Sequence, residues 1–189
     1  MCMAEAADVA DPASVQALAA RVERSPGRLD ILINNAAVTS PWGEQAAGAD
    51  LDGVAALMQA NLYGPWRMAQ ALLPLLRQSP AGRIVNVSSG AGSHVDAVFG
   101  LTSGNAMGTG YAVSKAALNA LTVKQAREEA SPALRINAVC PGFTATFEGG
   151  AAMGARPPAE SAKGIVWAAL LPEGGPRGGF FRDGQPLGW

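Results

Sequence analysis

The chain has 189 residues, of which 49% are hydrophobic and only 15% are charged, and its formal net charge is −1. This length and composition allow a substantial core, which excludes a disordered chain, and the near-zero charge gives no reason to expect nucleic acid or an acidic membrane as a partner. No apolar run reaches the roughly 18 to 20 residues of a membrane span, so we expect one domain over residues 1–189 that does not cross a membrane.

Short apolar runs alternate with segments of helical periodicity along the chain. The predicted elements are a helix from Asp11 to Pro26, a strand over 29–33, a helix from Asp50 or Asp52 to Leu76, a strand over 84–87, a helix over 111–130, a strand over 136–139, a helix over 158–171 and a strand over 179–181. Short strands that are apolar on both faces and separated by helices are typical of a parallel sheet covered on both sides. We therefore predict an α/β fold with a doubly wound parallel sheet of the Rossmann type.

In such sheets, ligands bind beyond the carboxyl ends of the strands. That rule directs attention to Asn34–Ala37, Ser88-Ser89, Pro141-Gly142 and the glycine-rich loop before Tyr111. Tyr111 and Lys115 lie one helical turn apart on the same face, where a positive charge would lower the pKa of the phenol and favour proton transfer. The pair alone is weak evidence, because it also fits an ordinary surface helix.

Five segments occur in an order that resembles a known family over about residues 8–189. They are Asn34-Asn35-Ala36-Ala37, Asn61-Leu62-Tyr63-Gly64, Ile84-Val85-Asn86-Val87-Ser88-Ser89, Tyr111-x-x-x-Lys115, and Pro141-Gly142-Phe143-Thr144-Ala145-Thr146. Together they resemble the short-chain dehydrogenase/reductase family. The ending Gly178–Gly184 and the long loop from Ser89 to Tyr111 are similar to its carbonyl-reductase-like branch.

The resemblance implies an oxidoreductase that reduces a ketone, aldehyde or quinone to an alcohol. Tyr111 matches the general acid, and Lys115 matches the residue that lowers the phenol pKa and binds the nicotinamide ribose. Ser89 matches the residue that binds the carbonyl oxygen, whereas Ser88 is disfavoured because neighbouring strand residues point to opposite faces. Asn61 matches the helix residue whose backbone holds a water that links the lysine to solvent.

The resemblance also implies a nicotinamide cofactor, with NADP(H) favoured over NAD(H) by likeness to the carbonyl-reductase branch. Its expected contacts are Asp8 and Val9 at the adenine, Asn34, Ala36 and Ala37 after the first strand, Tyr111 and Lys115 in the helix, and Pro141, Gly142 and Thr146 at the carboxamide. The family usually has glycine where Ala37 stands. Each of these residues also has an ordinary structural interpretation as part of a tight turn.

The family normally begins with a strand and a Thr-Gly-x-x-x-Gly-x-Gly turn that holds the cofactor pyrophosphate. No such turn precedes Asp8, so we expect the first βαβ portion, roughly 50 residues, to be absent and the fold to be N-terminally truncated. The residue that separates NAD from NADP would be absent with it. Residues 103–110 have similar glycine spacing, but they open the helix that carries Tyr111, and we interpret them as a substrate loop.

Two hypotheses remain at this point: an active NAD(P)H-dependent carbonyl reductase, and a truncated, catalytically inactive relative that acts as a dimerising scaffold. The resemblance implies a small-molecule carbonyl substrate and a homo-oligomer that forms through the helices carrying Asn61 and Tyr111. No metal site is expected, because His94 is the one histidine and no cysteine or acidic cluster has ligand spacing. Cys2 and Cys140 are too few for a disulfide framework, which fits a reducing cytoplasm.

Overall fold

A five-stranded sheet forms the centre of the computed structural model, which describes residues 4–104 and 108–189. Its strands lie side by side in chain order: β1 (Ile31–Asn34), β2 (Arg83–Val87), β3 (Arg135–Val139), β4 (Phe180–Arg182) and β5 (Gln185–Pro186). The first four are parallel, and β5 is antiparallel to β4. The predicted α/β fold with a predominantly parallel sheet is confirmed.

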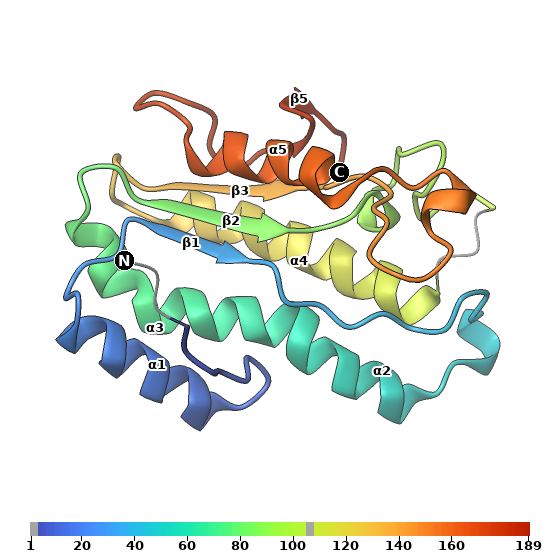
Figure 1. The fold of residues 1–189 in the computed structure, drawn as a ribbon, viewed down its shortest axis with the longest axis horizontal. Coiled ribbons are helices and arrows are strands. Elements are labelled where there is room, and N and C mark those ends of the chain that lie inside the picture. Colours follow the sequence, from blue (N-terminus) through green and yellow to red (C-terminus); the bar gives the residue numbers. More distant parts are fainter. Residues whose placement is uncertain (1–3, 105–107) are drawn as a thin grey trace.

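Helices cover both faces of this sheet (Figure 1). They are α1 (Pro12–Arg24), α2 (Leu51–Met58), a π-helical segment η2 (Gln59–Tyr63), α3 (Gly64–Gln78), α4 (Thr109–Glu128) and α5 (Pro158–Ala169), with short 3₁₀ turns η1 (Ala46–Gly48), η3 (Gly90–Gly92) and η4 (Ala151–Met153). In Figure 1, α5 lies on one face, whereas α3 and α4 lie on the other and α1 packs outside α3. The sheet is therefore doubly wound, as predicted.

Side-chain caps explain where two of the helices begin. Asp11 accepts hydrogen bonds from the N–H groups of Ala13 and Ser14 and so caps α1. Asp50 accepts from the Asp52 N–H, so of the two candidates Asp50 is the N-cap of α2. The strand expected from residue 29 begins at 31 instead, and the Asp30 side chain before it accepts hydrogen bonds from Arg28 and Ser79.

Alternation along the strands divides the core into two layers. The larger layer lies on the face covered by α3 and extends to α1, and includes Val15, Leu32, Leu72, Leu76, Ile84, Leu134 and Ile136. On the opposite face, Val85 and Val139 pack against Ala168 and Ala169 of α5. Because α5 is the one helix over that face in the described part of the chain, Ile33 of β1 remains 42% exposed.

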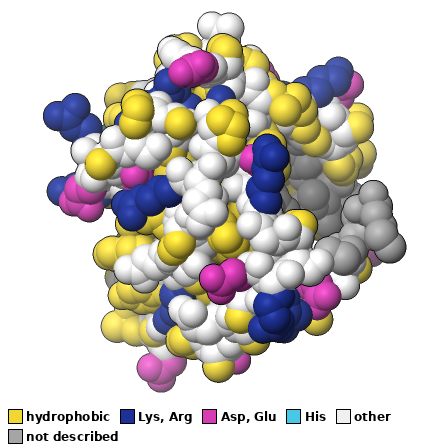
Figure 2. Space-filling model, turned by 90° about the vertical axis from the view of Figure 1, so that its left-hand side faces the viewer, with side chains coloured by type: hydrophobic (Ala, Val, Ile, Leu, Met, Phe, Trp, Pro, Cys, Tyr) yellow, Lys and Arg dark blue, Asp and Glu magenta, His cyan; other side chains and the backbone are white. Residues whose placement is uncertain are grey.

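The end of the molecule where the strands begin carries both signs of charge. Figure 2 shows Lys and Arg side chains interspersed there with Asp and Glu and with hydrophobic groups, and neither sign forms a continuous field on this face. In residues 4–104 and 108–189, no helix has the length and apolar character needed to cross a membrane.

Candidate active site

The carboxyl ends of β1, β2 and β3 meet around a cavity of about 760 Å³. Eight of the predicted site residues line it: Ala36, Ala37, Ser89, Tyr111, Lys115, Pro141, Gly142 and Thr146. Segments from four places in the sequence therefore meet at the position that the parallel-sheet rule predicts.

Helix α4 places Tyr111 in its first turn, against this cavity. The Gly110 N–H donates to Oε2 of Glu44 at 2.7 Å, and the Tyr111 N–H donates to Oγ of Ser40 at 3.2 Å. The segment between β1 and α2 thus satisfies the open N–H groups at the start of α4.

The electrostatics of Tyr111 differ from the prediction made from its spacing to Lys115. Burial raises the pKa of the Tyr111 phenol above its ordinary value, while an interaction with the Ser89 hydroxyl opposes that rise. The phenol therefore keeps its proton at neutral pH, which is the state required of a proton donor.

Lys115 is buried directly behind Tyr111. Its side chain is 2% exposed, its Nζ donates to the Val87 carbonyl at 2.8 Å, and the Nζ lies 5.6 Å from the centroid of the Tyr111 ring. Burial lowers the pKa of Lys115 to about 8, so most of the ammonium remains charged at neutral pH. The site therefore holds a positive charge near the phenol, and the cost is the loss of hydration of the Lys115 ammonium.

The two serines after β2 have different partners. The Ser88 hydroxyl donates to Oδ1 of Asn119 in α4 at 2.5 Å and is buried, whereas the Ser89 Oγ accepts from the Ala91 N–H at 3.2 Å and lies at the cavity. This is the divergence expected from alternation along a strand, and it places the Ser89 hydroxyl at the cavity, beside the Tyr111 phenol.

Asn61 lies in the π-helical segment and is fully buried. Its side chain accepts from the Val38 N–H at 2.8 Å and donates to the Val38 carbonyl at 2.8 Å and to the Ser114 Oγ at 3.0 Å. Asn61 therefore joins the loop after β1 to the helix that carries Tyr111. A π segment in a long helix is often associated with a functional site.

Four of the predicted residues do not line the cavity: Asp8, Val9, Asn34 and Asn61. The Asn34 amide donates to Oδ1 of Asn86 at 2.8 Å inside the sheet. Asp8 accepts from the Ala10 N–H, and Val9 packs against the helix at Gly64, where an added Cβ would lie 2.9 Å from Cγ2 of Val9. The predicted cofactor roles of Asp8, Val9 and Asn34, and the predicted catalytic role of Asn61, stay predictions.

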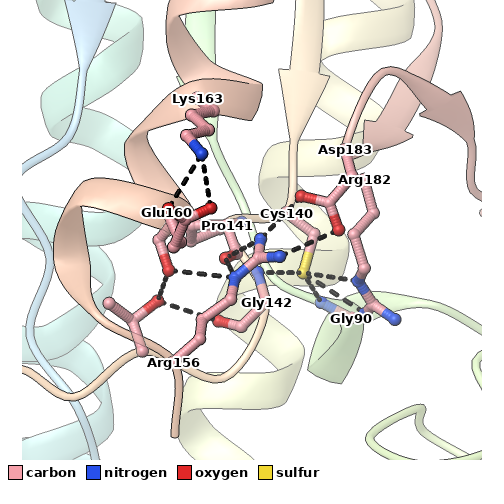
Figure 3. Close-up of polar contacts among 11 residues, drawn as sticks. Gly90, Cys140, Pro141, Gly142, Arg156, Glu160, Lys163, Arg182 and Asp183 are labelled. Atoms are coloured by element: carbon pink, nitrogen blue, oxygen red, sulfur yellow. Dashed lines mark hydrogen bonds and ion pairs between the residues drawn. The ribbon is translucent and has the colours of Figure 1, made fainter.

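A network of polar contacts fixes the segment that follows β3 (Figure 3). Arg156 donates to the Pro141 carbonyl through Nε at 2.9 Å, and its Nη1 and Nη2 donate to Asp183 at 2.9 and 2.8 Å. Gly142 has a φ of +74°, and an added Cβ would lie 3.0 Å from the Arg156 guanidinium. A glycine is therefore required here both by the backbone and by the close approach of Arg156.

Cys140 anchors the other side of the same segment. Its Sγ accepts from the N–H groups of Gly90 and Gly142 at 3.2 and 3.3 Å and from the guanidinium of Arg182, which also pairs with buried Asp96. Figure 3 shows Cys140, Arg182 and Gly90 clustered to the right of the Arg156 guanidinium. The thiol thus links the ends of β2, β3 and β4.

The sequence predicted no site role for the aromatic part of the lining, which consists of Trp42, Phe99, Phe143 and Phe147, although Phe143 stands inside one of the five matching segments. The available signal was the position of Trp42 between Pro41 and Gly43, a composition typical of a loop rather than a core. The predicted substrate loop over 103–110 includes Asn105, Ala106 and Met107, which lie outside the described residues, so that prediction is not tested.

Comparison with protein families and curated proteins gives consistent similarities. A family model described as short chain dehydrogenase matches residues 1–152. The (−)-isopiperitenone reductase of Mentha piperita is 34% identical, over 95% of this chain and 78% of that protein. Oxidoreductase UcpA of Salmonella typhimurium is 38% identical over 77% of this chain, which spans 51% of that protein's length.

Solved structures give similarities at the level of the fold. The NADPH-bound carbonyl reductase from chicken fatty liver superposes with a TM-score of 0.81 and 28% identity, over 97% of this chain and 75% of that one. A short-chain dehydrogenase/reductase family oxidoreductase from Brucella ovis, in complex with a partially ordered NAD, gives a TM-score of 0.71 and 26% identity, over 93% of this chain and 76% of that one.

Proposed function

Since the chain belongs to the short-chain dehydrogenase/reductase family, we propose that it is an NAD(P)H-dependent oxidoreductase that reduces a carbonyl to an alcohol. The observation that carries this proposal is the meeting of the Tyr111 phenol, the Ser89 hydroxyl and the Lys115 ammonium at one cavity beyond the strand ends. A hydroxyl pair of this kind can bind a carbonyl oxygen from two sides.

Each of these side chains has one role in the proposed reaction. The Ser89 hydroxyl donates a hydrogen bond to the carbonyl oxygen and stabilises the negative charge that develops there. Tyr111 holds its proton at neutral pH and transfers it to that oxygen. Lys115 places its positive charge near the phenol and stabilises the phenolate that remains after transfer.

The residues around the cavity fit the nicotinamide end of a dinucleotide. Ala36, Ala37 and Gly142 present small side chains or none, so a planar ring can approach the backbone closely. When bound, this cofactor supplies the hydride that adds to the carbonyl carbon. Thr146 offers a hydroxyl to the carboxamide end, and we assign Asp8, Val9 and Asn34 to the remainder of the cofactor by family resemblance.

We propose NADPH rather than NADH. Support comes from the NADPH-bound chicken carbonyl reductase, whereas the Brucella ovis relative is a complex with NAD. The comparison of both cofactors at equal concentration, by initial rates and by direct binding, decides between them.

The proposal is tested by following NADPH oxidation in the presence of a simple ketone. Tyr111→Phe removes the transferable proton and is expected to lower the rate by roughly two to four orders of magnitude. Tyr63→Phe is the matched control, because Tyr63 is exposed and lies outside the cavity. Equal activity of the two variants, or a folded chain that binds neither cofactor at millimolar concentration, contradicts the proposal.

We also propose that the protein is a cytoplasmic homo-oligomer that associates through the helices bearing Asn61 and Tyr111. Leu51 of α2 is 75% exposed and Val113 of α4 is 45% exposed, so both helices offer apolar surface for association. Light scattering coupled to size-exclusion chromatography measures the state directly. An assembly that forms without cofactor binding favours the inactive scaffold.

A further inference from the structure

Four aromatic rings form a connected cluster on one side of the cavity. Trp42 lies 6.4 Å from Phe143 and 6.1 Å from Phe147, measured between ring centroids. Phe143 lies 6.0 Å from Phe99 and 6.1 Å from Phe147. We call these four residues the aromatic wall.

The aromatic wall is assembled from three separate loops that leave the carboxyl ends of consecutive strands. Trp42 comes from the segment after β1, Phe99 from the segment after β2, and Phe143 and Phe147 from the segment after β3. Trp42 and Phe147 remain 53% and 42% exposed although they line the cavity. Their apolar surface is therefore still available to a ligand.

The cavity offers almost no charge to a ligand. Among the described residues that line it, the one charged side chain is Lys115, which is buried and already donates to the Val87 carbonyl. The nearby Arg156 does not line the cavity, and its guanidinium is held by Asp183, the Pro141 carbonyl and Ser161. A carboxylate brought into this space would lose hydration and gain no free cationic partner.

We propose that this site takes an uncharged carbonyl compound that carries a ring, aromatic or alicyclic, with the ring against the aromatic wall and the carbonyl oxygen at Ser89 and Tyr111. This inference rests on the proposed function for the position of the carbonyl. Rings pack well against aromatic rings in edge or offset geometry. Because the rings of the aromatic wall are inclined to one another at different angles, they offer both faces and edges to a ligand ring.

Three ketones that share one reacting group test the inference. Methyl benzoylformate carries the ring without charge, benzoylformate carries the same ring with a carboxylate, and methyl pyruvate has neither ring nor charge. We expect kcat/KM for methyl benzoylformate to exceed that for benzoylformate about a hundredfold and that for methyl pyruvate about tenfold. Equal values for the first two ketones, or a preference for methyl pyruvate, overturn the inference.

Substitutions in the aromatic wall measure how much it contributes to the preference for a ring-bearing ketone. Trp42→Ala or Phe147→Ala is expected to reduce the preference for methyl benzoylformate over methyl pyruvate by about tenfold, and the partial exposure of both rings makes either change compatible with folding. Trp66→Ala removes an equally exposed ring outside the cavity and is expected to leave the preference as it was. An unchanged preference in both wall variants contradicts the inference.

A binding measurement separates this inference from the proposed reaction. Saturation-transfer NMR on the phenyl protons of methyl benzoylformate reports contact with the protein whether or not NADPH is oxidised. Contact that weakens in Trp42→Ala but persists in Trp66→Ala supports the aromatic wall even in a chain without turnover. Absence of contact in the unmodified protein refutes it, whereas absence of turnover alone refutes only the reductase.

Discussion

Replacement of Lys115 by methionine is expected to change the pH dependence of stability. Lys115 is 2% exposed, and burial lowers its pKa from 10.5 to about 8. The unfolded chain therefore binds more protons than the folded chain between these pH values, so this lysine makes the folded chain gain stability as pH rises through the window. Below about pH 8 the folded chain carries the full destabilisation that comes from burying the ammonium.

The size of the effect follows from the same two pKa values. At about 1.4 kcal/mol per pH unit, the full difference corresponds to about 3 kcal/mol, of which about 2 kcal/mol is recovered by pH ~9.5. Methionine lacks this ionisation but also lacks the hydrogen bond to the Val87 carbonyl, which adds a contribution that does not vary with pH. The free energy of unfolding of Lys115→Met minus that of the unmodified chain should therefore fall by about 2 kcal/mol from neutral pH to about pH 9.5.

Urea unfolding followed by circular dichroism at several pH values measures this difference. Lys124→Met is the matched control, because Lys124 lies on the same helix with its side chain 70% exposed, so that its ammonium is not desolvated by burial. A constant difference for Lys115→Met would refute the argument that burial of the ammonium is the dominant influence. Activity should be lost in Lys115→Met and retained in Lys124→Met.

Two further substitutions test the packing around the site. Asn61→Ala leaves the Val38 N–H and carbonyl without their partner and is expected to lower the free energy of unfolding by about 2 to 3 kcal/mol, measured by urea unfolding; a loss below about 0.5 kcal/mol would contradict the bridging role. Gly92→Ala places a Cβ 2.4 Å from the Ala116 nitrogen and should destabilise by about 1 to 3 kcal/mol by forcing η3 away from α4. Gly48→Ala is its control, because an added Cβ there meets no atom of the described residues within 4 Å. Equal midpoints of thermal unfolding in the two variants would show that the backbone accommodates the methyl group of Gly92→Ala.

Most of the fold could be predicted because its strands are short apolar runs between well-marked helices. The four parallel strands and the caps Asp11 and Asp50 follow from hydrophobic pattern and local hydrogen bonding. β5 was missed because a two-residue strand shows no periodicity. The π segment around Asn61 was missed because its i→i+5 geometry leaves no distinct sequence pattern.

Some features of the candidate site could also be predicted from the sequence, and others could not. Ser89, Tyr111 and Lys115 meet because each is attached to a strand end or helix whose position the fold determines. The direction of the pKa shift of Tyr111 could not be predicted from spacing, since it depends mainly on burial. Trp42 and Phe99 were missed because their loops meet only in the folded chain, and no local rule places them together.

The separation between the buried side chains of α4 and the exposed aromatic wall has a consequence for how such a protein changes over generations. Lys115 and Ser114 are held inside the core, where almost any substitution disturbs packing. Trp42 and Phe147 stand on loops with half of their surface in water, where exchange for another residue leaves the core intact. Under the proposed function, exchange of one loop residue at a time would therefore change the substrate that packs against the aromatic wall and leave the proposed proton-transfer residues unchanged.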